Sequence, residues 1–158
     1  MIFATMDTHV KLLECPRYPE GAAFPCTPKT IEHPAWEQIE TAIRRLNKHS
    51  HPFIFLAPVI DEEERINGDN EFFEVMGGCG DYWVAGSMNG YWQRRAINDS
   101  GTDDEIDLWT SDQGFAASGK FIIHDLNDAI MATKYYYERN DFWPKLKWEE
   151  QEPRQNAT

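Results

Sequence analysis

Between residues 53 and 117 the chain is a succession of short segments, apolar or alternating, each bounded by turn-forming or acidic residues. Segments of about four to eight residues with this pattern are typical of β-strands. The predicted strands are residues 53–59, 71–76, 82–87, 91–97, 106–109 and 114–117. Asn89-Gly90, between the third and the fourth, is a strong signal for a hairpin turn. Because short connections join antiparallel strands, this stretch predicts an antiparallel sheet.

Helical periodicity appears on both sides of this stretch, at about residues 33–49 and 125–139. In the first segment, Pro34 suits the opening turn, and apolar residues follow at helical spacing at Trp36, Ile39, Ile43 and Leu46. In the second, Asp125 can cap the first turn, and the apolar stripe consists of Leu126, Ala129, Ile130, Thr133 and Tyr137. We therefore expect one α+β domain, with an antiparallel sheet of about five to seven strands and both helices packed on it.

The ends of the chain complete this predicted domain. An N-terminal strand and a proline-rich connector make up residues 1–32, which we assign to the same domain as the core at 33–148. A buried strand at 120–123 is expected to lead into the second helix, and a short strand at 145–148 to follow it. Residues 149–158 are expected to form a loose tail.

The net charge of −12 is the strongest compositional signal, and it is unevenly placed. Between Asp61 and Asp107 the chain has thirteen acidic residues against three basic ones. Binding to nucleic acid requires clustered lysine and arginine, so a direct interaction with nucleic acid is not expected. No apolar run is long enough to cross a membrane, and the N-terminus does not resemble a secretory signal. Three scattered cysteines without metal-type spacing indicate reduced thiols, which favours a cytoplasmic protein.

Four candidate chemical sites are each explained more simply by structure. Gly77–Gly80 lacks the Lys-Ser/Thr ending of a phosphate-binding loop, and His49-Ser50-His51 lacks a third metal ligand. Asp103–Asp107 lacks the spacing of a calcium-binding loop. His124-Asp125 has no accompanying nucleophile motif, so we interpret it as a buried histidine and a helix cap. We therefore predict no catalytic residue, no metal site and no cofactor.

Aromatic residues are concentrated in the predicted hairpin. Tyr82, Trp83, Tyr91 and Trp92 are four of the twelve tryptophans and tyrosines of the chain. Neighbouring residues of a strand point to opposite faces of a sheet. The aromatic side chains on one face should therefore pack into the core, and those on the other face should be exposed. Exposed rings among acidic loops are typical of a protein-binding hot spot. The alternative is that helices cover both faces.

Several segments together resemble a known family. They are the helix from Trp36 to Leu46, the apolar strand at 53–56, and a C-terminal unit made of a strand, a helix containing Ala129 and Ala132, the aromatic residues 135–137, and the closing sequence Trp143-Pro-Lys-Leu-Lys-Trp148. In these features the chain resembles bacterial immunity proteins of the polymorphic-toxin and contact-dependent growth inhibition systems, Imm family 1. The resemblance spans roughly residues 30 to 150 and is a pattern of elements rather than a strict motif.

The resemblance implies a non-enzymatic inhibitor that binds the toxin domain encoded beside it, often a nuclease or a nucleic-acid deaminase. The acidic composition agrees independently, because complementary potentials speed the encounter with a basic partner. The predicted toxin-binding residues lie in two acidic loops and the aromatic hairpin: Asp61, Glu62, Glu63, Glu64, Asp69, Tyr82, Trp83, Tyr91, Trp92, Asp99, Asp103, Asp104, Glu105 and Asp107. Two alternatives stay open, a small ligand-binding or scaffold domain without a toxin partner, and a small hydrolase.

Overall fold

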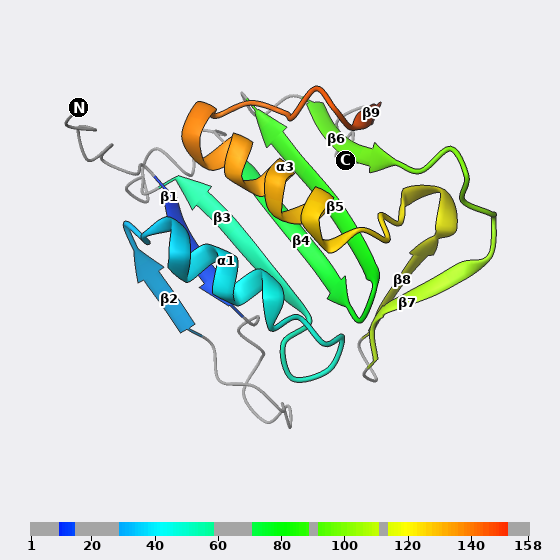
Figure 1. Cartoon of the computed structure of the whole chain (residues 1–158), viewed down its shortest axis with the longest axis horizontal. Coiled ribbons are helices and arrows are strands. Elements are labelled where there is room, and N and C mark those ends of the chain that lie inside the picture. The colour runs from blue at the N-terminus through cyan, green and yellow to red at the C-terminus, as the bar shows by residue number, and fades with distance from the viewer. Residues whose placement is uncertain (1–9, 15–28, 59–70, 89–91, 111–113, 152–158) are drawn as a thin grey trace, which may run out of the picture.

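The computed structural model describes residues 10–14, 29–58, 71–88, 92–110 and 114–151, which form one α+β domain (Figure 1). Seven strands make an antiparallel sheet in the order β2-β1-β3-β4-β5-β6-β9, and β7 pairs with β8 in a separate two-stranded sheet. The predicted fold class is therefore confirmed. The elements are β1 (Val10–Glu14), β2 (Lys29–Glu32), α1 (Trp36–Arg44), β3 (Phe53–Pro58), β4 (Phe72–Gly78), β5 (Asp81–Met88), β6 (Trp92–Ile97), β7 (Glu105–Trp109), β8 (Phe115–Ser118), the 3-10 turn η1 (Gly119–Phe121), α3 (Leu126–Arg139) and β9 (Lys147–Gln151).

Both α-helices lie side by side on one face of the seven-stranded sheet (Figure 1). The alternation of β4 directs Phe73 and Val75 toward the helices, and both side chains are fully buried there. The ring of Tyr136 from α3 stacks on Phe73, with 4.9 Å between the ring centroids. The main hydrophobic core is therefore the layer between the helices and this face of the sheet.

Helix α1 is shorter than the expected span of 33–49, at both ends. Its N-cap is Ala35, whose backbone N–H donates to the side chain of Gln38 at 2.8 Å. At the other end, the side-chain oxygen of Asn47 accepts hydrogen bonds from the backbone N–H groups of His49 and His51. These side-chain bonds offer the backbone an alternative to helix, so the chain turns away before the periodic pattern ends.

Helix α3 has the predicted caps at both ends. The carboxylate of Asp125 accepts from the backbone N–H of Asn127 at 2.8 Å, and Asn140 ends the helix in the left-handed conformation. The buried strand predicted at 120–123 is wrong, because η1 occupies the first half of that segment and only Ile123 pairs, through an isolated bridge to Tyr82. The serine before η1 explains the turn, since the side-chain oxygen of Ser118 accepts from the backbone N–H of Lys120.

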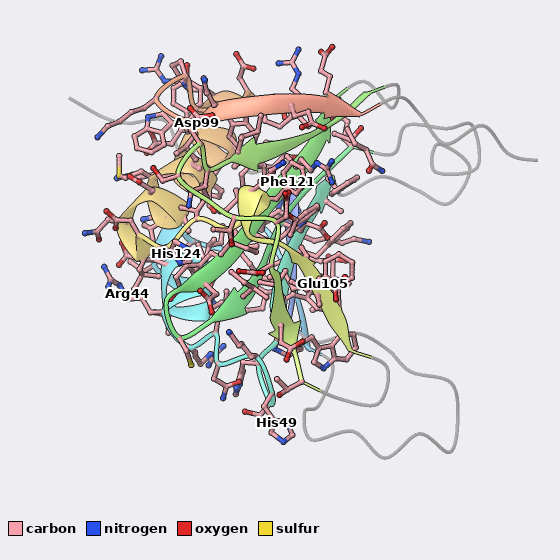
Figure 2. The ribbon with its side chains drawn as sticks, turned by 90° about the vertical axis from the view of Figure 1, so that its right-hand side faces the viewer. Arg44, His49, Asp99, Glu105, Phe121 and His124 are labelled. Atoms are coloured by element: carbon pink, nitrogen blue, oxygen red, sulfur yellow. The ribbon has the colours of Figure 1, made fainter. Side chains whose placement is uncertain are left out.

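The β7–β8 hairpin packs on the opposite face of the sheet, so the helices and the hairpin lie on opposite sides of it (Figure 2). This pair of strands agrees with the pair predicted at 106–109 and 114–117. A register shift between Asp107 and Trp109 interrupts the pairing of β7. Leu108 is fully buried in the second apolar cluster, and the neighbouring Trp109 also packs against the sheet, with 6.3 Å between the centroids of its ring and the Phe53 ring.

The two ends of the chain contribute more to the sheet than the sequence predicts. Strand β2 lies inside the segment that we expected to be a proline-rich connector, and it pairs with β1 at one edge of the sheet. At the other edge, β9 extends to Gln151, so the expected tail begins with three residues of strand. Ion pairs explain the extension, because Arg94 and Arg95 of β6 contact Glu150 and Glu149 at 2.6 and 3.0 Å.

Candidate functional site

An exposed acidic segment runs from the end of β6 into β7, and we call Asp99–Asp107 the acidic segment. Its five carboxylates, all exposed, belong to Asp99, Asp103, Asp104, Glu105 and Asp107. Figure 2 labels Asp99 at its start and Glu105 at the beginning of β7. Backbone hydrogen bonds to η1 hold it in place, from Asn98 N–H to Lys120 at 2.6 Å and from Gly119 N–H to Asp104 at 2.9 Å. The predicted exposure is confirmed for all five residues, whereas the predicted loop is confirmed for Asp99, Asp103 and Asp104 and gives way to strand β7 at Glu105.

The negative charge of the acidic segment is only partly compensated. Asp99 pairs with Lys147 at 2.9 Å, and Asp103 pairs with Lys120 at 2.8 Å. The hydrogen bond from Lys120 to Asp103, together with the attraction between their charges, raises the pKa of Lys120. Among the described residues, no cationic side chain forms an ion pair with the three remaining carboxylates, those of Asp104, Glu105 and Asp107.

Strand β7 displays two of these free carboxylates on a rigid support. The strand alternates, so Ile106 and Leu108 pack inward against the sheet while Glu105 and Asp107 are exposed to solvent. Across the hairpin, Glu105 lies opposite Ser118 and Asp107 opposite Ala116. Small residues on β8 therefore leave the acidic row of β7 unobstructed. A surface of this kind is suited to electrostatic attraction of a cationic partner.

The predicted exposed aromatic face of β5 is wrong. Tyr82 is only 5% exposed in the main core, and Trp83 is only 9% exposed in the second cluster. The reason is that the β7–β8 hairpin and η1 form a third layer, in which Phe115 and Phe121 pack edge-on against Trp83. Among the described aromatic side chains, Phe115 is instead the exposed one, at 40%.

The structure does not describe the side chains of several predicted site residues. Trp92 begins β6 and pairs through its backbone with Met88. Six others lie outside the described residues, namely Asp61, Glu62, Glu63, Glu64, Asp69 and Tyr91. Their part in a binding surface stays a prediction from sequence.

A polar cluster joins the turn between β4 and β5 to the start of α3. The ammonium nitrogen of Lys48 lies 2.6 Å from one carboxylate oxygen of Asp81, with which it forms an ion pair. The ring nitrogen Nδ1 of His124 lies 3.1 Å from the other carboxylate oxygen. The same ring nitrogen is 3.0 Å from the carbonyl oxygen of Gly80, so it carries a hydrogen to donate. His124 is 55% exposed, so the predicted buried histidine is wrong, whereas Asp125 is a cap as predicted. These contacts hold the residue before the N-terminus of α3 against the β4–β5 turn of the sheet.

A partly buried carboxyl group that sequence reasoning missed lies on the hairpin side of the sheet. The side chain of Glu74 accepts a hydrogen bond from the indole N–H of Trp83 at 3.1 Å. Burial raises the pKa of Glu74, and this hydrogen bond offsets only part of that effect. The alternation of Phe72-Phe73-Glu74-Val75-Met76 contains the signal, because it sets a glutamate between two apolar residues on one face of the strand.

The described residues contain no group of three or more histidine, cysteine or acidic side chains arranged to hold a metal ion. Neither of the two described α-helices is long and apolar enough to cross a membrane. No family model matches the chain, and no curated protein matches it in sequence.

Proposed function

We propose that this chain is a cytoplasmic immunity protein that binds a cognate toxin domain and neutralises it without catalysis. The toxin is a nuclease or a nucleic-acid deaminase whose basic surface would otherwise hold nucleic acid. The acidic segment faces this surface in the complex. The observation that carries the proposal is the row of carboxylates without ion pairs, Asp104, Glu105 and Asp107, exposed beside a firmly packed hairpin.

Electrostatic complementarity between the two surfaces supports this proposal. A toxin that grips phosphates must present clustered lysine and arginine, and an inhibitor with the opposite potential approaches it faster than a neutral one. Steered association reaches about 10⁸–10⁹ M⁻¹s⁻¹ at low salt, against about 10⁵–10⁶ for neutral surfaces. The pattern of elements that resembles Imm family 1 suggests such a toxin, and the exposed carboxylates suit its basic surface.

The test is the rate of association with the toxin domain encoded beside this chain, followed by stopped-flow fluorescence at low and physiological salt. Reversing the three free carboxylates, as Asp104→Lys, Glu105→Lys and Asp107→Lys together, should slow association at least tenfold at low salt. The dependence on salt should weaken as well. Unchanged rates in this variant would rule out steering by the acidic segment.

A matched control separates the acidic segment from net charge. Glu32→Lys, Glu37→Lys and Glu138→Lys together change the net charge by the same amount at exposed positions on β2, α1 and α3. Exposed charges further apart than the Debye length, about 10 Å at 0.1 M salt, are largely screened. The control variant should therefore associate within about threefold of the unmodified chain at that salt concentration.

A further inference from the structure

The β7–β8 hairpin covers only part of its face of the sheet. Phe55 and Phe72 lie on the same face outside the second apolar cluster, and both keep partial exposure. Their rings stack at 5.3 Å between centroids, with 11° between the ring planes. Glu74 lies beside this pair, since it is the cross-strand partner of Phe55 and is two residues from Phe72 on β4. A carboxyl group and a stacked aromatic pair thus share this part of the sheet.

The carboxyl group of Glu74 has few partners for a charged group. An ionised carboxylate can accept about four hydrogen bonds, whereas Glu74 receives one from Trp83 and, among the described residues, no ion pair. Withdrawing a carboxylate even partly from water without a nearby cation is unfavourable, which agrees with the raised pKa of this partly buried group. A cation brought to this place would restore the missing interaction.

We propose that this face binds a cationic side chain of a protein partner, with an arginine contacting the carboxylate of Glu74 and lying over the Phe55–Phe72 pair. That the partner is a basic protein rests on the proposed function. Arginine fits best because its planar group both stacks on aromatic rings and donates two parallel hydrogen bonds to a carboxylate.

The same chain already combines these two contacts elsewhere. The guanidinium group of Arg95 lies 3.4 Å from the centre of the Phe121 ring while it donates to Glu149 at 3.0 Å. Arg94 lies 5.1 Å from the Phe142 ring and contacts Glu150 at 2.6 Å. Glu74 with the Phe55–Phe72 pair offers the carboxylate and the rings of such an arrangement, with the arginine left for the partner to supply.

The first experiment uses N-acetyl-L-arginine methylamide as the probe and the full chain as the receptor. The NMR signal of the Trp83 indole N–H, which is bonded to Glu74, should shift and saturate as the probe is added. The neutral analogue N-acetyl-L-citrulline methylamide should cause no saturable shift. Glu74→Gln preserves an acceptor for Trp83 but removes the charge, and it should weaken probe binding at least fivefold. No saturable shift, or equal shifts in Glu74→Gln, would overturn the proposal.

Two further variants keep the test independent of folding and of the acidic segment. Phe72→Leu removes the stacked ring while it keeps an apolar side chain, and it should weaken probe binding at least twofold. The variant with reversed charges at Asp104, Glu105 and Asp107 should bind the probe as the unmodified chain does, because Glu105 and Asp107 are on the solvent-exposed side of β7 and Asp104 is exposed just before it. If the unmodified chain self-associates and Glu74→Gln abolishes that self-association, this face binds a second copy of the chain and the proposal is contradicted.

The second experiment compares the unmodified chain and Glu74→Gln in binding to the toxin domain encoded beside it. We expect affinity to fall at least tenfold in the variant. Binding by the unmodified chain with equal affinity in Glu74→Gln would refute this inference and leave the proposed function standing. Absence of binding by the unmodified chain would refute the proposed function, and the titration with the arginine probe would then decide the inference alone.

Discussion

Two adjacent tyrosines of α3 should respond to loss of the hydroxyl group in opposite ways. Tyr136 is fully buried, and its hydroxyl oxygen has no hydrogen-bond partner in the described part of the chain. Burial, with a smaller contribution from the charge of Glu71, raises the pKa of this phenol, as expected for a hydroxyl group withdrawn from water. Tyr137 differs, because its hydroxyl donates to the carbonyl oxygen of Pro34 at 2.9 Å.

The structure sets the size of both effects. A buried polar group without a partner costs about 1–3 kcal/mol, and Tyr136→Phe removes that cost while it keeps the ring stacked on Phe73. The lost contacts of one oxygen atom offset part of the gain, at about 0.1–0.2 kcal/mol for each contact. We therefore expect Tyr136→Phe to stabilise the fold by about 1 kcal/mol. Tyr137→Phe loses a hydrogen bond and should destabilise it by about 0.5–1.5 kcal/mol.

The assay is thermal and urea unfolding of the three proteins, followed by circular dichroism at one pH. For a domain of this size, 1 kcal/mol shifts the melting temperature by about 2–4 °C. The two variants should move it in opposite directions, with unchanged denaturant slopes. If Tyr136→Phe destabilises the protein as much as Tyr137→Phe, then the Tyr136 hydroxyl has a partner and the reasoning is wrong.

Three other substitutions test separate parts of the structure. Burial raises the pKa of Glu74, so this residue contributes stability below the ordinary glutamate pKa, and that contribution is lost as pH rises through the raised value. Glu74→Gln should therefore raise the melting temperature at pH 7 and make the melting temperature less dependent on pH. An unchanged pH profile of the melting temperature would count against an unfavourable charge at Glu74. Gly78 has φ of +135°, and an added Cβ would lie 2.4 Å from the carbonyl oxygen of Leu46, whereas a Cβ added to Gly80 would meet nothing within 4 Å. In urea unfolding, Gly78→Ala should therefore lower the free energy of unfolding more than Gly80→Ala does. Equal decreases in the two variants would contradict this reasoning. Asp125→Ala removes the cap of α3 and should cost about 0.5–2 kcal/mol by the same assay, whereas no loss would show that the cap bond is unimportant.

Local signals in the sequence predicted the parts of the fold that short-range interactions determine. The cap at Asp125 and the left-handed Asn140 follow from side-chain and backbone properties within one turn of helix. The β7–β8 pair follows from two short segments joined by a short connection. The acidic segment is exposed as expected, because its charges favour water over the core.

The errors arose where distant parts of the chain meet. Alternation correctly assigned Tyr82 and Trp83 to opposite faces, but it holds no information on whether a hairpin some thirty residues later covers the second face. His124 is exposed, and its partners Gly80 and Asp81 come from the β4–β5 turn, which the local pattern does not bring near it. The alternation of β4 placed Glu74 on an otherwise apolar face, but its hydrogen bond to Trp83 and its partial burial depend on neighbouring strands.

The function proposed for this chain is neutralisation of a toxin by binding, and calorimetric titration against a toxin domain encoded next to it would test that proposal most directly. We predict one-to-one binding with nanomolar or lower dissociation constant, and loss of the toxin's activity as the ratio of the two proteins reaches one. Absence of binding, or a toxin that stays active with excess of this chain, would contradict the account.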